Sequence, residues 1–115
     1  FDIKPRLVYA DSRVLRDAGR VCVARGPVVY CAEGVDNGAY LQSYSIPDSP
    51  VFNEIFDKSF GLYVLTVDCS KEINFEDELY SNRAPQKVRA SLKLIPYNCF
   101  ANRGETDMAV WLCRE

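Results

Sequence analysis

The sequence predicts an all-β domain, in the form of an antiparallel β-sandwich or jelly roll. Short runs of apolar, β-branched and aromatic residues recur between Gly, Pro, Asn and Ser turn signals, and they amount to roughly six to eight strands. No stretch keeps the apolar periodicity of an amphipathic helix. A chain of 115 residues can bury one hydrophobic core, so we predict a single domain over residues 1–115.

The strand pattern is clearest around a central pair. Apolar residues fill Val21–Ala24 and Val28–Cys31, and a Gly-Pro step separates the two runs. Pro27 cannot donate to a sheet ladder, which places it at a bulge, a strand start or an edge. The turn-forming stretch 34–38 closes the pair. We predict two mostly buried strands with a polar loop at their end.

Before this pair, Leu7–Tyr9 predicts a first strand, and the polar stretch Asp11–Asp17 fits either a single helical turn or a loop. After it, Tyr40–Ile46 alternates in the manner of a strand until the prolines and turn formers of 47–50 interrupt it. The apolar spacing of Val51–Phe56 suits a helical turn as well as a strand, so both interpretations stay open.

The second half of the chain predicts three further strands. Phe60–Cys69 alternates, and Lys87–Leu94 does so most regularly, with apolar residues on one face and polar residues on the other. The polar stretch 71–85 between them predicts a long connection that either carries an interface or is mobile. Ile95–Tyr97 predicts a bulge. Met108–Cys113 is apolar on both faces, which predicts a last, central strand.

Charge and composition argue against several classes of partner and chemistry. The formal net charge is −2, whereas nucleic acids and anionic membrane surfaces favour clustered basic residues. No apolar run approaches the roughly 20 residues of a membrane span. His is absent, so Ser-His-Asp and Cys-His nucleophile arrangements cannot be built from this chain alone. We predict no nucleic-acid partner and no membrane partner.

The cysteines are widely spaced and form no CxxC pair. Because they lie mostly in apolar strand runs, we predict free, buried thiols in preference to disulfides, and a local zinc site is disfavoured as well. Free thiols would favour a reducing compartment such as the cytoplasm. The chain opens on Phe1 without Met, so we expect a piece of a longer protein. The five cysteines are Cys22, Cys31, Cys69, Cys99 and Cys113.

Carboxylate and aromatic side chains offer candidate chemistry. Carboxylates gather at Glu33 and Asp36, at 76–78, and at Glu105 and Asp107. A pair of them could serve glycoside hydrolysis, although acidic residues at turn edges are more often solvated or capping. Aromatic residues could stack on sugar rings, but most of them fall in predicted strands, where core packing is the plainer interpretation.

Three segments in register resemble one protein family. They are GRVCVARGPVVYCAEGVDN (19–37), LIPYNCFANRG (94–104) and MAVWL (108–112). In this order and spacing they resemble the C-terminal region of glycoside hydrolase family 127, the bacterial beta-L-arabinofuranosidase family. The family pattern usually has an aromatic residue at the place of Asn98 and Trp at the place of Phe100. Both changes are compatible with the same strand.

The resemblance implies a division of labour. In the family, an (α/α)6-barrel catalytic domain is followed by β-sandwich domains, and the retaining chemistry is attributed to a cysteine nucleophile at a zinc ion held by Glu and Cys ligands within the barrel. That barrel is absent from this chain, so no catalytic residue, metal ligand or cofactor transfers to it. Zinc is implied only for the catalytic domain. Cys31 and Glu33 belong to the sandwich motif, and we assign them no zinc.

The first hypothesis is therefore a non-catalytic accessory domain that packs against the catalytic domain of the same polypeptide, the whole being a glycosidase. The docking residues it predicts lie in two polar turns, since polar rims suit contacts between domains. One turn holds Glu33, Asp36 and Asn37, and the other holds Asn102 and Arg103.

Two alternatives stay open. A carbohydrate-binding module would stack sugars on exposed aromatic side chains, with Tyr97, Phe100 and Trp111 as candidates. A self-contained enzyme would use paired carboxylates. The first requires sugar binding by this chain itself, and the second requires hydrolysis by it.

Overall fold

The computed structural model describes residues 3–73, 79–99 and 106–115. Within them the chain forms nine strands, one short helix, α1 (Gly34–Asn37), and two 3-10 turns, η1 (Leu41–Ser43) and η2 (Tyr97–Cys99). The strands are β1 (Pro5–Tyr9), β2 (Arg20–Arg25), β3 (Val28–Glu33), β4 (Tyr44–Ile46), β5 (Phe52–Asp57), β6 (Leu62–Ile73), β7 (Gln86–Pro96), β8 (Met108–Ala109) and β9 (Leu112–Arg114).

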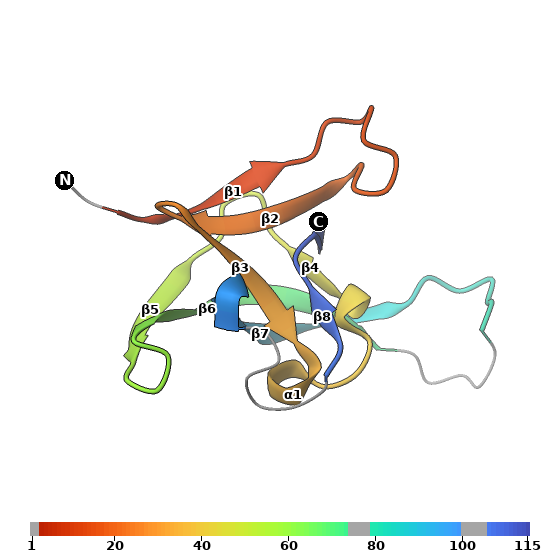
Figure 1. Cartoon of the computed structure of the whole chain (residues 1–115). Helices are drawn as coiled ribbons and strands as arrows, with labels where there is room; N and C mark the ends of the chain where they lie inside the picture. Colours follow the sequence, from red (N-terminus) through yellow and green to blue (C-terminus); the bar gives the residue numbers. More distant parts are fainter. Residues whose placement is uncertain (1–2, 74–78, 100–105) are drawn as a thin grey trace.

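Six of these strands close into a barrel, so the all-β prediction is confirmed and the sandwich or jelly roll is wrong. The strands follow one another in the order β2, β9, β4, β6, β7 and β3, and β3 pairs back onto β2 to complete the ring. Strands β1, β5 and β8 add to β2, β6 and β3 from outside this ring. Figure 1 shows β2 above β6 and β7, and β3 running down from β2 across them.

The barrel closes because β3 changes partners along its length. Its start pairs with β2 (Val29 with Ala24), its middle with β7 (Cys31 with Ile95) and its end with β8. The single strand β3 thus connects β2 with β7, which a sandwich would place in separate sheets. The prediction of a purely antiparallel sheet also fails at one place, because β4 and β9 run parallel. Alternation in a sequence reports which face a residue occupies, and it carries no information about the neighbouring strand.

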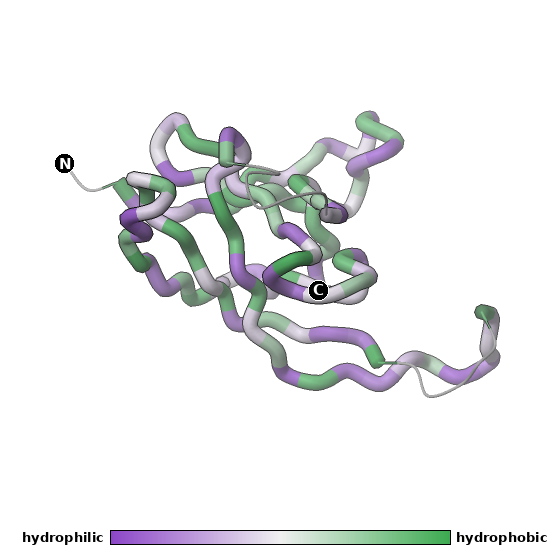
Figure 2. The backbone as a smooth tube through the Cα atoms, turned by 60° about the horizontal axis from the view of Figure 1, so that its bottom comes forward, coloured by the Kyte–Doolittle hydropathy of each residue, from purple (hydrophilic) through white to green (hydrophobic). Residues whose placement is uncertain are grey.

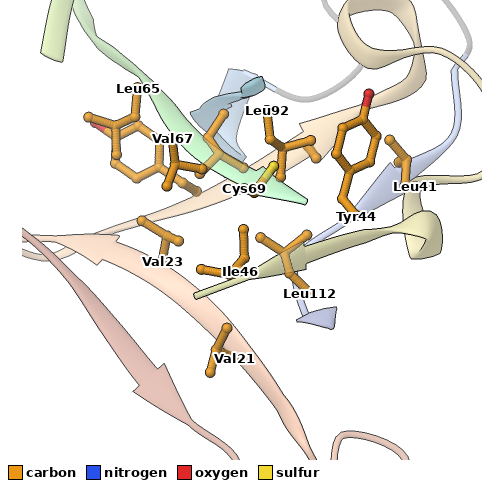
Figure 3. Packing of buried hydrophobic residues seen from close by; sticks show 13 residues of the cluster. Val21, Val23, Leu41, Tyr44, Ile46, Leu65, Val67, Cys69, Leu92 and Leu112 are labelled. Carbon is orange, nitrogen blue, oxygen red and sulfur yellow. The ribbon is translucent and has the colours of Figure 1, made fainter. Parts of the chain in front are cut away.

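The core lies inside the barrel and draws on every one of its six strands. Figure 3 shows the apolar side chains of β2, β4, β6, β7 and β9 converging on this interior. The side chains of Leu65, Val67 and Leu92 are completely buried. The buried cluster comprises Val21, Val23, Tyr30, Ala32, Leu41, Tyr44, Ile46, Leu65, Val67, Cys69, Leu92, Leu94 and Leu112.

A second, smaller cluster lies on the outer face of the sheet. Because successive residues of a strand point to opposite faces, β6 supplies Leu65 to the interior and Val64 to this outer cluster. Val64 packs there with Cys31, Ile95 and Cys99. Cys99 belongs to η2, so this short turn covers part of the outer face of the barrel.

Several predicted elements change in extent. Only 44–46 of Tyr40–Ile46 is strand, because η1 precedes it, whereas Val51–Phe56 resolves into β5. The connection predicted over 71–85 is shorter at its start, because β6 continues to residue 73, and it ends where β7 begins at residue 86. The end of β6 and the start of β7 lie in a largely hydrophilic arm that projects from the body (Figures 1 and 2). Met108–Cys113 divides into β8 and β9, and β9 lies centrally between β2 and β4.

The predicted break at 95–97 shifts, because β7 runs through Pro96 and η2 follows. Asp11–Asp17 forms successive turns, with the amide of Val14 donating to the Asp11 carbonyl at 2.9 Å. All five cysteines are free thiols, and four of them are buried as small apolar residues, which confirms that part of the prediction. Cys113 is the partly exposed one.

The centre of the core gives a first test. Leu65→Ala should lower the free energy of unfolding by roughly 2–5 kcal/mol, because it leaves a cavity where no part of the side chain reaches solvent. Urea denaturation followed by circular dichroism measures this. Leu79→Ala, at a side chain with 95% exposure, is the matched control and should change stability by less than about 0.5 kcal/mol. Equal effects of the two substitutions would contradict the assigned core.

The buried thiol of Cys69 gives a second test. Burial, aided by the carboxylates of Asp68 and Glu115, raises its pKa from 9.0 to about 11. The fold therefore disfavours the thiolate, so this contribution to stability is complete below pH 9 and is lost as the pH rises towards 11. The loss amounts to roughly 2 kcal/mol at most. Urea unfolding at a series of pH values should show a shallower decline for Cys69→Ala than for the native chain, while Cys113→Ala should keep the native slope.

Candidate functional site

The predicted docking loop begins where β3 ends. Glu33 is the last residue of β3, pairs with Met108 of β8 and has a completely buried side chain. The sequence places this carboxylate at a turn, but the strand continues two residues beyond Cys31, and the Glu33 side chain at its end is buried. In this chain, Glu33 therefore presents no surface to a partner.

Asn37 closes the loop and binds two strands at once. Its side-chain amide donates to the carbonyl of Glu33 at 3.0 Å and to the carbonyl of Lys93 at 3.0 Å. Its side-chain oxygen accepts the backbone N–H of Lys93 at 2.8 Å. The hydroxyl of Tyr44 donates to the Asn37 carbonyl at 2.8 Å. An amide side chain thus takes the place of a neighbouring strand beside Lys93, and it ties α1 to β7 and β4.

The rest of the loop is held by the segment that leads into β8. The backbone N–H of Gly34 donates to the Asp107 carbonyl at 2.8 Å, and that of Val35 donates to the Thr106 hydroxyl at 2.8 Å. A Cβ atom at Gly34 would lie only 3.1 Å from this hydroxyl, which favours glycine there. Asp36 is largely buried, with its carboxylate 3.5 Å from the Lys93 ammonium.

The structure therefore brings Glu33, Asp36 and Asn37 together, but chiefly as an internal clasp. Their role in docking stays a prediction, and the exposed part of this loop is Val35, with 54% of its surface open. Sequence reasoning did not single out Val35, since one apolar residue in a polar turn gives no signal. Asn102 and Arg103, the other predicted docking residues, lie outside the described residues, as does the aromatic candidate Phe100.

The two described aromatic candidates occupy different places. Tyr97 is half exposed on η2. Trp111 is partly buried and lines a surface hollow of about 390 Å³, whose lining does not include Tyr97. The hollow lies between η1 and the β8–β9 segment. Its lining residues are Arg20, Tyr40, Leu41, Gln42, Asp107, Met108, Ala109, Trp111, Leu112 and Cys113.

Tyr40 is a second aromatic residue of this lining, and sequence reasoning did not single it out. Sequence reasoning assigned it to a strand and to a general pool of aromatic residues. Instead it has left-handed backbone angles, φ 61° and ψ 61°, directly before η1, and its side chain is 73% exposed. No non-glycine residue elsewhere in the described ranges has a positive φ. Tyr is an unusual choice for this conformation, so no local sequence signal marks it.

A further cluster lies where β5 approaches the end of β2. Arg25 bonds the carboxylate of Glu54 at 2.5 Å, and its guanidinium lies 4.4 Å from the ring centre of Tyr63. Tyr63 in turn meets Phe56 edge to face, with 5.4 Å between ring centres. These contacts hold the outer strand β5 against the barrel, and a structural role accounts for them.

In the part of the chain that the structure describes, no group of three or more His, Cys, Asp or Glu side chains could hold a metal ion. No helix within the described ranges is long and apolar enough to cross a membrane. Fold and site together define a small all-β domain whose polar loop ties β3 to β7 and whose surface carries an aromatic-lined hollow.

Comparison with known proteins identifies the family. Residues 5–113 match the sequence model of the glycoside hydrolase family 127 C-terminal domain, and the chain belongs to that family. It is 35% identical, over 96% of its length, to a non-reducing end beta-L-arabinofuranosidase of Bifidobacterium longum subsp. longum, of which it covers 18%. The resemblance seen in the sequence is therefore confirmed.

Solved structures agree. A GH127 beta-L-arabinofuranosidase from Geobacillus stearothermophilus T6 matches the whole chain with a TM-score of 0.93 at 31% identity, and the chain covers 19% of it. A second GH127 beta-arabinofuranosidase matches the whole chain with a TM-score of 0.82 at 36% identity, with 18% of that protein covered. The chain thus spans about a fifth of the length of these relatives.

The clasp gives a third test. Asn37→Ala removes the amide from Glu33 and Lys93 together and leaves backbone groups of β7 unpaired, which should cost roughly 2–4 kcal/mol of unfolding free energy. Hydrogen exchange at the Lys93 amide should accelerate in the same variant. Asn53→Ala, at an exposed Asn of β5, is the control and should change neither quantity appreciably. Native-like protection of Lys93 in Asn37→Ala would refute the clasp.

Proposed function

We propose that this domain is a non-catalytic accessory module of a GH127 glycosidase acting on arabinofuranosides, and that it packs against the catalytic domain of the same polypeptide and stabilises it. The observation that carries the proposal is the match of the whole chain to one fifth of enzymes that bear that activity in their names. A chain without His, whose carboxylates at the predicted loop are committed to internal contacts, is poorly equipped for hydrolysis of its own.

The contacts of the α1 loop favour one of its residues as the point of contact with the catalytic domain. Glu33, Asp36 and Asn37 fix the loop, and Val35 is the side chain that the clasp leaves exposed. An apolar side chain on a rigid loop can enter a pocket of a neighbouring domain without losing conformational freedom of the backbone. We therefore place the docking contact at Val35, with the polar residues as its support.

Deleting the segment matching residues 5–113 from the longer polypeptide tests the module as a whole. The shortened enzyme should retain arabinofuranoside hydrolysis per folded molecule and should unfold at a lower temperature, because it loses the packed partner. Loss of hydrolysis in a shortened enzyme that is still folded, judged by circular dichroism, would contradict a non-catalytic role.

Val35→Asp tests the docking contact within the same polypeptide. A charge at the interface should lower the melting temperature by roughly 2–4 °C for each kcal/mol of docking energy lost. The isolated 115-residue chain should melt normally, since Val35 is exposed in it. Leu15→Asp, at a side chain 91% exposed in the β1–β2 loop, is the matched control and should leave both melting temperatures unchanged. Equal melting of the two full-length variants would exclude docking at Val35.

The alternative function, carbohydrate binding by the chain itself, is favoured by one observation. Trp111, one of its predicted sugar-stacking residues, lines the hollow together with an exposed tyrosine.

A further inference from the structure

We propose that the hollow between η1 and the β8–β9 segment is a binding site for a neutral saccharide ring, with Tyr40 and Trp111 as its aromatic walls. The inference is independent of the accessory role, since it concerns a property of the isolated chain. It also differs from the sequence-based alternative, because it replaces Tyr97 with Tyr40.

The size of the hollow suits a small ligand. Its volume of about 390 Å³ falls at the lower end of the range for ligand sites. Met108 and Ala109 are partly exposed residues of the lining, so part of it is apolar and can receive the apolar face of a ring. Aromatic side chains provide the flat surfaces on which sugar rings stack, and both Tyr and Trp add a polar tip.

The polar residues around the hollow are available for hydrogen bonding. Arg20, Gln42 and Asp107 carry a guanidinium, an amide and a carboxylate. Within the described part of the chain, none of these three side chains forms a hydrogen bond or an ion pair, and neither does the Tyr40 hydroxyl or the Trp111 indole N–H. Five polar groups in one lining are thus without a protein partner among the described residues.

The chemistry of these groups selects the class of ligand. A guanidinium only donates, a carboxylate only accepts and an amide does both, whereas a sugar hydroxyl can serve each of them. The opposite charges of Arg20 and Asp107 offset one another, so the hollow favours neither an anion nor a cation. A neutral polyol with one apolar ring face satisfies both the aromatic walls and the mixed polar groups.

The backbone at Tyr40 supports a role for its side chain. A non-glycine residue in the left-handed region carries a conformational cost, which the surrounding structure must offset. The Tyr40 carbonyl accepts the amide of Ser43 at 2.9 Å and the Ser43 hydroxyl at 2.7 Å. Two bonds thus fix the residue from which the exposed ring projects, and a fixed aromatic wall binds with a smaller entropic loss.

The experiment uses the fluorescence of Trp111, which is the only tryptophan in the chain and therefore reports on the hollow directly. The 115-residue chain is titrated with L-arabinose and with a β-L-arabinofuranosyl disaccharide, and glycerol at equal hydroxyl concentration serves as a ring-free control. We expect a saturable change with a Kd on the order of 1 mM for the sugars, as befits so small a ligand. Glycerol should give none.

Two variants assign the site. Tyr40→Asn removes the aromatic wall but keeps a residue that tolerates left-handed angles, and it should weaken binding roughly tenfold. Tyr97→Ala removes the exposed aromatic residue outside the hollow and should leave Kd unchanged. Circular dichroism confirms that both variants keep the native fold.

A second measurement does not depend on fluorescence. Cys113 lines the hollow as the partly exposed thiol of the chain, so bound sugar should slow its alkylation by iodoacetamide several-fold. Absence of a saturable response to both sugars would overturn the proposal. So would an unchanged Kd in Tyr40→Asn, an unchanged alkylation rate under saturating sugar, or a weakening confined to Tyr97→Ala.

Discussion

Closure of the barrel depends on β3, since this strand pairs with three neighbours within six residues. Each change of partner leaves backbone N–H and C=O groups of the neighbouring strands without a strand partner. Polar side chains have to supply the missing hydrogen bonds. Asn37 does so for both backbone groups of Lys93 in β7, and the Tyr30 hydroxyl donates to the carbonyl of Tyr63 in β6 at 2.7 Å. The polar residues at the end of β3 are therefore a consequence of the closure.

Much of the local structure could be predicted, because it depends on properties that the sequence contains directly. Both strands of the central pair formed where apolar runs indicated them, and β7 alternates with Leu92 and Leu94 inside. Closure could not be predicted, because it depends on which distant strands meet. Val29 and Ala24 pair across a short hairpin, but β9 reaches β2 from the far end of the chain, and nothing in its composition specifies that neighbour.

The same distinction explains the outcome at the candidate sites. An Asn in a turn gives one local signal, whether it faces solvent or fastens a strand, and only the pairing with Lys93, 56 residues away, decides between them. Glu33 looked like a turn residue because charged side chains are rarely buried, yet at the end of β3 its side chain is completely buried. Trp111 could be named as an aromatic candidate from composition. Its neighbour Tyr40 could not, because its conformation runs against the preference of its residue type.

The clasp and the hollow share Asp107, and this determines which substitutions can test one without affecting the other. The Asp107 carbonyl accepts the backbone N–H of Gly34 in the α1 loop, while Asp107 itself belongs to the lining of the hollow. A shift of this residue would disturb both features, so an effect of substituting it could be ascribed to neither. Val35 belongs to the α1 loop and Tyr40 to the lining of the hollow, and both side chains are exposed. Substitutions of these two side chains therefore test the proposed docking and the proposed saccharide binding separately, although both features share Asp107.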